Sequence, residues 1–169
     1  MFTDSLDIEP LEERHAAEMH EALLDPRLYP FIPENPPASL EHLEAMFRRF
    51  LAGPPADSGE VWLNWVIRDH SSKACIGTLQ ATYFASGELW AGYKIIPPWW
   101  GRGVATAGVR WLLDELQSRF PDIPVLASVD TRNLGSIRVL EKCGFELVRR
   151  EGAELHGEKT EDFVYCLKR

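Results

Sequence analysis

The chain has 169 residues, of which 45% are hydrophobic, and it carries a formal net charge of -8. This length and composition predict one globular domain over residues 1–169, because a chain of this size can bury most of its apolar surface in a single core. No stretch approaches the ~20 consecutive apolar residues that a membrane span needs. We therefore expect no membrane partner. A nucleic-acid surface needs a basic stripe, which this sequence lacks, so we expect no nucleic-acid partner either.

The cysteines and histidines indicate no metal site. Cys75, Cys143 and Cys166 are odd in number and widely separated, and His15 and His20 fall on different faces of a helix. The first ten residues, MFTDSLDIEP, carry acids where a signal peptide would carry a basic region and an apolar run. We therefore expect reduced thiols, no bound metal and a cytoplasmic location.

The first part of the chain predicts a strand and two helices around a long loop. Residues 6–11 alternate apolar and polar side chains, as in a short strand. Helical spacing runs over residues 12–24 and again over residues 40–51, where Ser39 is a candidate N-cap. Between the two helices, residues 25–39 hold five prolines and a patch of Tyr, Phe and Ile. A loop of this length is typically functional or disordered, and its aromatic side chains argue against disorder.

The middle of the chain predicts three strands and a helix. Short turns separate residues 61–69, 74–84 and 88–96, which are rich in β-branched and aromatic side chains. Short connections between strands are typical of an antiparallel meander. Residues 104–120 then return to helical spacing, with apolar side chains along one face.

The last part of the chain predicts a buried strand, a capped helix and a closing pair of strands. Residues 123–129 are almost continuously apolar, which is typical of a buried strand. A helix through residue 145 would begin at Asn133, a good N-cap residue, and residues 146–155 and 161–169 would form the closing pair. This order of elements predicts an α+β fold in which a mixed sheet of about seven strands is flanked by helices.

The segment PPWWGRGVATAG, residues 97–108, joins the third strand of the meander to the next helix. Gly101 and Gly103 leave the backbone bare and permit positive φ, while Arg102 adds a cation at the rim. Because the first N–H groups of a helix have no partner inside the helix, this turn predicts an anion site. Trp99 and Trp100 would brace the turn against the body of the domain.

The Gly-x-Gly pattern alone leaves its function open. It is compatible with a tight strand-to-helix turn that has no ligand, and with a nucleotide site at the same helix terminus. The third glycine of a dinucleotide-binding fingerprint is missing, because position 106 is Thr. No repeated strand–helix units precede the turn, which disfavours a Rossmann fold.

Two motifs in order resemble those of the GNAT superfamily of N-acetyltransferases, and most closely its RimJ/RimL-like branch, which acetylates the N-terminal amine of ribosomal proteins. The first is IIPPWWGRGVATAGVRWLLDEL and the second is NLGSIRVLEKCGF, about thirty residues later. The superfamily loop (Q/R)-x-x-G-x-(G/A), which binds the pyrophosphate of acetyl-CoA, maps onto residues 100–105. Trp100 stands at the Gln/Arg position. Asn133 and Ser136 match the second motif.

The resemblance implies a splayed central pair of parallel strands with acetyl-CoA as the cosubstrate. The pantetheine arm would lie in the splay, beside the backbone of Lys94 and its two neighbours, with residues 125–129 as the opposite wall. An unpaired strand edge offers backbone donors and acceptors to an amide-containing ligand. The expected cofactor-binding residues are Ile95, Ile96, Trp100, Gly101, Arg102, Gly103, Val104, Ala105, Thr106 and Asn133.

The resemblance also implies direct attack of a neutral amine on the thioester carbonyl. Many relatives protonate the leaving thiolate with a tyrosine at the position of Leu140, which cannot donate a proton. The implied acid is therefore Ser136, although its hydroxyl could instead serve only its own helix terminus. Relatives often carry an acid at the position of Trp90. Glu88 is the nearest acid on that strand face and is the candidate base, whereas Tyr93 faces the other way and is expected in the core.

The acceptor is expected to be an amine: a protein N-terminus, a small amine such as a free amino acid, or a polyamine, which the acidic surface would suit. The apolar side chains of the loop at residues 25–39, namely Leu28, Tyr29, Phe31 and Ile32, predict a wall of the acceptor pocket, with sealing of the core edge as the alternative. A second functional reading is a catalytically silent module that only binds acyl-CoA. The chain would act as a monomer or a homodimer.

Overall fold

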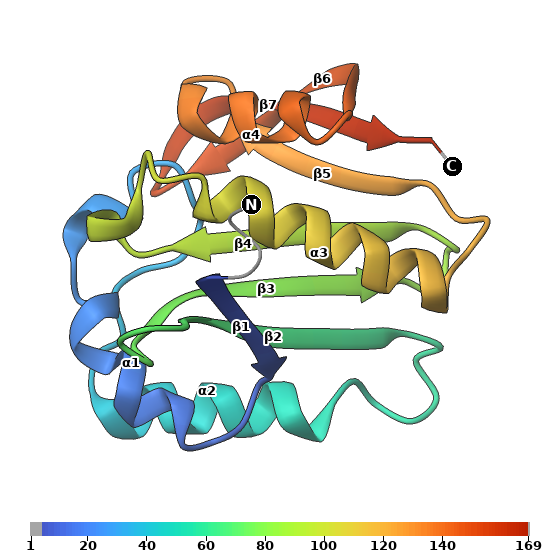
Figure 1. The fold of residues 1–169 in the computed structure, drawn as a ribbon. Helices are drawn as coiled ribbons and strands as arrows, with labels where there is room; N and C mark the ends of the chain where they lie inside the picture. The colour runs from blue at the N-terminus through green and yellow to red at the C-terminus, as the bar shows by residue number, and fades with distance from the viewer. Residues whose placement is uncertain (1–4, 169) are drawn as a thin grey trace.

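The computed structural model describes residues 5–168, so Met1–Asp4 and Arg169 lie outside the described part of the chain. Figure 1 shows the strands and helices along the chain. In chain order they are β1 (Leu6–Pro10), α1 (His15–Leu23), η2 (Pro26–Leu28), α2 (Leu40–Ala52), β2 (Val61–Asp69), β3 (Cys75–Tyr83), β4 (Leu89–Ile95), η3 (Pro97–Trp99), α3 (Val104–Arg119), β5 (Val125–Asp130), α4 (Leu134–Lys142), β6 (Glu146–Leu155) and β7 (Glu158–Leu167).

All seven strands form one sheet in the order β1-β2-β3-β4-β5-β7-β6. The pairs within β1 to β4 and within β5 to β7 are antiparallel, whereas β4 and β5 are parallel. The predicted fold class, a mostly antiparallel mixed sheet with a central parallel pair and flanking helices, is therefore confirmed. The expectation of a single domain over residues 1–169 stays a prediction.

Several predicted boundaries differ from the structure, and two of the differences have a local reason. The first helix starts at His15 and not at residue 12, because the ring of His15 accepts the backbone N–H of Glu12 (2.8 Å) and closes a turn there. The expected loop at residues 25–39 contains the short turn η2, which Asp25 caps by accepting the N–H of Arg27 (3.0 Å). The last strand begins at Glu158, three residues earlier than expected.

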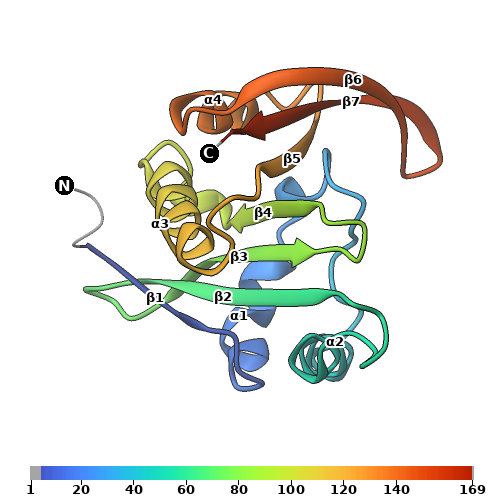
Figure 2. The same cartoon turned by 90° about the vertical axis from the view of Figure 1, so that its right-hand side faces the viewer.

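Helices cover both faces of the sheet, and alternate residues of β2 show which face belongs to which helices. Trp65 and Ile67 belong to the main core, where they pack with residues of α3, whereas Val66 belongs to a second core formed with α1 and α2. Figures 1 and 2 show α3 and α4 on one side and α1 and α2 on the other. Gly108 lets α3 approach the sheet closely, because a Cβ there would lie 2.9 Å from the Ile67 side chain.

The parallel strands β4 and β5 stay together for only a short distance. Their pairing covers Leu89 with Val125 and Trp90 with Leu126. Beyond these pairs β4 follows β3 and β5 follows β7, so the two strands part toward their C-terminal ends. We call this part of β4 and β5 the splay, and it is the arrangement that the resemblance predicts.

Hydrogen bonds to β3 show which backbone groups of β4 point into the splay. Glu88 accepts the N–H of Phe84 (2.9 Å) and Ile96 donates to Ile76 (3.0 Å), so the even-numbered residues face β3. In an antiparallel ladder the residues in between direct their backbone groups to the opposite side. Ala91, Tyr93 and Ile95 therefore turn their N–H and C=O groups toward β5.

No helix within residues 5–168 is long and apolar enough to cross a membrane.

Candidate active site at the splayed strands

The connection from β4 to α3, residues 97–103, presents a bare backbone at the end of the splay, and we call it the Gly loop. Gly101 has φ 70° and Gly103 has φ 80°, both in the left-handed region that side chains disfavour. A Cβ built on Gly101 meets no atom within 4 Å, so the space beside it is open. The local reason for this shape is the two positive φ angles, which only the glycines adopt without strain.

Helix α3 begins directly behind this loop. Gly103 is its N-cap residue, and no side chain of the described residues caps it. The first bond inside the helix joins Ala107 N–H to Gly103 C=O (3.0 Å), so the amides of Val104, Ala105 and Thr106 have no acceptor inside the helix. These amides and the helix dipole make the end of α3 suitable for an anion.

The two tryptophans fix the Gly loop in different ways. Trp99 packs against the main core, and the Arg102 guanidinium lies 5.1 Å from the centre of its ring. Trp100 is 49% exposed, but its indole N–H donates to the backbone C=O of Ile95 (2.6 Å). This bond ties the loop to the last residue of β4. The accepting C=O of Ile95 faces the splay, whereas the N–H of Ile96 donates to the C=O of Ile76 on β3.

Helix α4 brings Asn133 and Ser136 to the same end of the sheet. Asn133 is the N-cap residue, because its side-chain oxygen accepts the backbone N–H of Ser136 (3.2 Å). The Ser136 hydroxyl does not turn back to its own helix terminus, since Ser136 Oγ lies 2.7 Å from the hydroxyl oxygen of Tyr93 on β4. Burial raises the pKa of Tyr93 to about 12, so this phenol stays protonated across the neutral range.

The sequence predicts Tyr93 as a core residue and does not predict its contact with Ser136. Its ring packs against the main core, as expected, but its hydroxyl leaves the core and pairs with Ser136. The alternation of β4 placed Tyr93 on the face of Leu89 and Ile95, which is the face that α3 and α4 cover. That signal identifies the face, but it does not identify the partner on α4.

The structure does not bring the two predicted catalytic residues together. Glu88 is exposed and precedes the first residue of β4, at the end where β4 and β5 are still paired. Its carboxylate accepts a long hydrogen bond from the Ser86 hydroxyl (3.4 Å). Glu88 shares the even-numbered face of β4 with Trp90, whereas Ser136 meets Tyr93 on the odd-numbered face.

The proline-rich loop, residues 25–39, contacts both sides of the splay. Lys94 of β4 forms an ion pair with Glu34, and its ammonium lies 5.9 Å from the centre of the Tyr29 ring. On the other side, the Arg132 guanidinium lies 5.5 Å from the centre of the Phe31 ring. His156, between β6 and β7, pairs with the backbone C=O of Tyr29 (3.0 Å). The loop thus connects β4 to the elements that follow β5.

The structure divides the apolar residues of this loop between two roles. Leu28 and Tyr29 are buried in the second core, and the Tyr29 hydroxyl donates to the backbone C=O of Leu23. Ile32 is partly buried against the same core. Phe31 is 36% exposed and contacts Arg132. The alternative of sealing the core edge thus describes Leu28 and Tyr29, and Phe31 is the member that remains available to a ligand.

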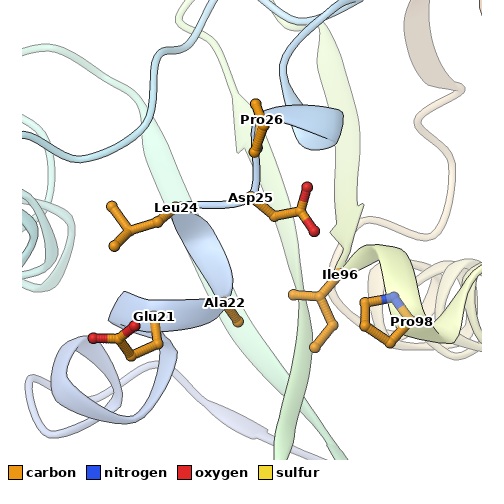
Figure 3. A pocket seen from close by; sticks show the side chains of 7 residues that line it. All are labelled: Glu21, Ala22, Leu24, Asp25, Pro26, Ile96 and Pro98. Atoms are coloured by element: carbon orange, nitrogen blue, oxygen red, sulfur yellow. The ribbon is translucent and has the colours of Figure 1, made fainter.

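A hollow of about 440 Å³ lies between the end of α1 and the start of the Gly loop (Figure 3). It is lined by Glu21, Ala22, Leu24, Asp25, Pro26, Ile96 and Pro98. Its two acids disfavour a phosphate group there.

A second hollow, of about 380 Å³, lies beside the turn after β5 and is lined by Thr131, Arg132, Lys159, Thr160 and Glu161. Within residues 5–168 no three His, Cys, Asp or Glu side chains could hold a metal ion together.

The splayed parallel pair ends at an uncapped helix N-terminus behind a glycine turn, which is the arrangement that the resemblance to the N-acetyltransferases predicts. Residues 5–146 match the family described as "Acetyltransferase (GNAT) domain". The chain therefore belongs to the GNAT acetyltransferase family. This confirms the family that the two sequence motifs indicate.

Comparisons with individual proteins agree with this assignment. The chain is 34% identical over 92 residues to the probable N-acetyltransferase YjcK of Bacillus subtilis. That match covers 52% of this chain and 51% of the relative, so the chain spans about half the length of the curated relative it matches.

Two solved structures show how widely the fold is shared. An acetyltransferase of Salmonella typhimurium that modifies the N-terminal serine of ribosomal protein L7/L12 superposes with a TM-score of 0.83 at 16% identity, over 98% of this chain and 95% of that one. The spermidine N-acetyltransferase of Vibrio cholerae, in complex with CoA and spermine, superposes with a TM-score of 0.78 at 19% identity, over 98% of this chain and 96% of that one. These likenesses support the fold and do not separate the branches of the family.

Proposed function

We propose that this chain transfers an acetyl group from acetyl-CoA to a primary amine by direct attack. The observation that carries the proposal is the splay of β4 and β5 ending at the uncapped N-terminus of α3 behind Gly101 and Gly103. A helix N-terminus suits a pyrophosphate, and an unpaired strand edge suits the amide groups of a pantetheine arm. Membership of the GNAT family supplies the reaction class.

The residues present fit acetyl-CoA. The amides of Val104, Ala105 and Thr106 would hold the pyrophosphate, and the open space beside Gly101 leaves room for its oxygens. The pantetheine arm would follow the side of β4 that carries the backbone groups of Ala91, Tyr93 and Ile95. Trp100 would keep the loop in place through its bond to Ile95.

The chemistry requires a neutral amine and a proton for the leaving sulfur. The pKa of a protein N-terminal amine is about 8, so an appreciable fraction is neutral near pH 7, whereas a lysine side chain has a pKa of about 10.4. Backbone N–H groups facing the splay would stabilise the developing oxyanion. The Ser136 hydroxyl, which contacts the Tyr93 hydroxyl of β4, would donate to the sulfur.

The acceptor would approach between the proline-rich loop and the β6–β7 hairpin. Phe31 is exposed there and contacts the Arg132 guanidinium. Glu34 of the same loop forms an ion pair with Lys94 of β4. Similar proteins modify a ribosomal-protein N-terminus or spermidine, so both a RimJ/RimL-like role and a small-amine role are consistent with this fold. The net charge of -8 favours the approach of a cationic acceptor.

The test combines binding with turnover. Calorimetry with acetyl-CoA should show one site per chain, and thiol release should appear with at least one amine in a panel of peptides with free N-termini, free amino acids and spermidine. The same peptides with a blocked N-terminus serve as the control. Acetyl-CoA binding without thiol release from any amine would contradict the transfer, and absence of binding would contradict the site.

A further inference from the structure

We propose that Tyr93 is a positioning residue for the transfer reaction: its hydroxyl orients the Ser136 hydroxyl so that the Ser136 hydrogen points at the leaving sulfur. This inference rests on the proposed function, because it concerns the same site. The observation behind it is the contact of 2.7 Å between the two hydroxyl oxygens, which joins β4 to α4 across 43 positions of sequence.

The direction of the hydrogen bond between the hydroxyls decides what Ser136 can do. Each hydroxyl has a single hydrogen, and a phenol is the stronger donor of the two because it is the more acidic. Tyr93 therefore donates and Ser136 accepts, which leaves the Ser136 hydrogen for another acceptor. Because burial raises the pKa of Tyr93 to about 12, the phenol keeps its proton throughout the neutral range.

The surroundings hold both groups in place. The Asn133 side chain accepts the Ser136 N–H and fixes the first turn of α4. The Tyr93 ring is anchored against the main core, so its hydroxyl has a defined position. Without this partner, a serine in the first turn of a helix can bond to nearby backbone groups instead. Leu140, one turn further along α4, is buried and has no hydrogen to donate.

The position of the pair fits the bond that must break. Tyr93 lies on β4 beyond its last pair with β5, and Ser136 lies in the first turn of the helix that follows β5, so their contact bridges the two strands of the splay, where a thioester would lie. In the transfer, the amine nitrogen forms a bond to the carbonyl carbon and the C–S bond breaks with its electron pair on sulfur. The sulfur gains one proton and the nitrogen loses one, so the step balances without another reactant. A hydrogen bond from Ser136 stabilises the thiolate as it forms.

The test is a double-mutant cycle on turnover. Tyr93→Phe removes the hydroxyl and keeps the ring, and Ser136→Ala removes the hydroxyl that is oriented. We expect Tyr93→Phe to lower kcat roughly tenfold with little change in KM for acetyl-CoA, and Ser136→Ala to lower it further. The double variant should match Ser136→Ala alone, because Tyr93 acts only through Ser136.

Tyr165→Phe is the matched control. Its hydroxyl also joins a strand to α4, by donating to Glu141 (3.3 Å), but it is not part of the site. It should keep kcat, and both Tyr→Phe variants should show similar thermal stability. The proposal is overturned if Tyr93→Phe keeps kcat, if the effects of Tyr93→Phe and Ser136→Ala multiply, or if Ser136→Ala has no effect. Wild-type protein that releases thiol in the same assay keeps these outcomes separate from a failure of the proposed function.

Discussion

Two loops meet at the C-terminal end of β4, and they use opposite means of shaping a site. The Gly loop presents backbone groups, and its two glycines adopt positive φ angles, with open space beside Gly101. The proline-rich loop presents side chains, and each of those near the splay already has a partner on another element. Figure 1 shows both loops at the same end of the sheet, and residues of both line the hollow of Figure 3.

The difference teaches which half of the site is general and which half is specific. A phosphate is recognised by backbone amides, which every sequence possesses, so the Gly loop needs only the right φ angles. In the proposed site the acceptor is recognised by side chains of the proline-rich loop, which long-range contacts hold in place. Changes in the first loop should therefore affect the cosubstrate, and changes in the second should affect the acceptor.

The largest expected effect on ligand binding comes from placing a β-branched side chain in the Gly loop. Gly103→Val forces valine into φ 80°, which L-residues avoid, and moves the amides at the start of α3. We expect acetyl-CoA affinity to fall by at least about tenfold, which corresponds to about 1.4 kcal/mol. Calorimetry on the folded variant measures the change.

The control for this substitution is Gly87→Val. Gly87 has φ 90° and open space around it, so valine there meets the same kind of backbone strain in the turn between β3 and β4. Both variants should lose stability, by roughly 1–2 kcal/mol, but only Gly103→Val should lose affinity for acetyl-CoA. Equal affinities in the two variants would remove the Gly loop from the cosubstrate site.

Features that depend on neighbouring residues could be predicted from the sequence. The positive φ at Gly101, the cap by Asn133 and the alternation of β4 each follow from a few adjacent residues. The pairs of Glu34 with Lys94 and of Tyr93 with Ser136 could not, because their partners are 60 and 43 positions apart. Which distant side chains meet depends on how strands and helices pack, and no local pattern encodes it.

The second prediction separates two neighbouring aromatic residues of the proline-rich loop. Phe31→Ala should raise the acceptor KM severalfold and leave the acetyl-CoA affinity unchanged, because Phe31 is exposed beside Arg132. Tyr29→Ala should instead lower the stability by about 3–5 kcal/mol, the usual cost of removing a large buried aromatic side chain. Steady-state kinetics and thermal unfolding of both variants measure the two effects. If Phe31→Ala lowers stability and leaves the acceptor KM unchanged, the whole loop belongs to the core.

The smallest expected effect concerns the ion pairs that join β1, β2 and α1. Arg68 of β2 is nearly buried and donates to Glu9 of β1 and Glu18 of α1. The hydrogen bond from Arg68 to Glu18 lowers the pKa of Glu18 to about 2, below the ordinary value of 4.5. A carboxylate with a lowered pKa stabilises the folded state fully above its unfolded pKa, and that stability is lost as the pH falls toward the folded pKa.

Glu18→Gln should therefore lower the free energy of unfolding by about 1 kcal/mol at pH 7, a modest value because the Glu18 side chain is 35% exposed. The difference from wild type should shrink between pH 5 and pH 2, as the wild-type carboxylate becomes protonated. Glu13→Gln is the control, because Glu13 pairs with Arg48 at the surface and should contribute less than about 0.5 kcal/mol. Acetyl-CoA affinity at pH 7 should stay unchanged in both variants, since no side-chain hydrogen bond or ion pair found within residues 5–168 joins this network to the Gly loop. A loss of affinity in Glu18→Gln as large as its relative loss of stability would show that the Gly loop depends on this network, and would contradict the expected independence of the two.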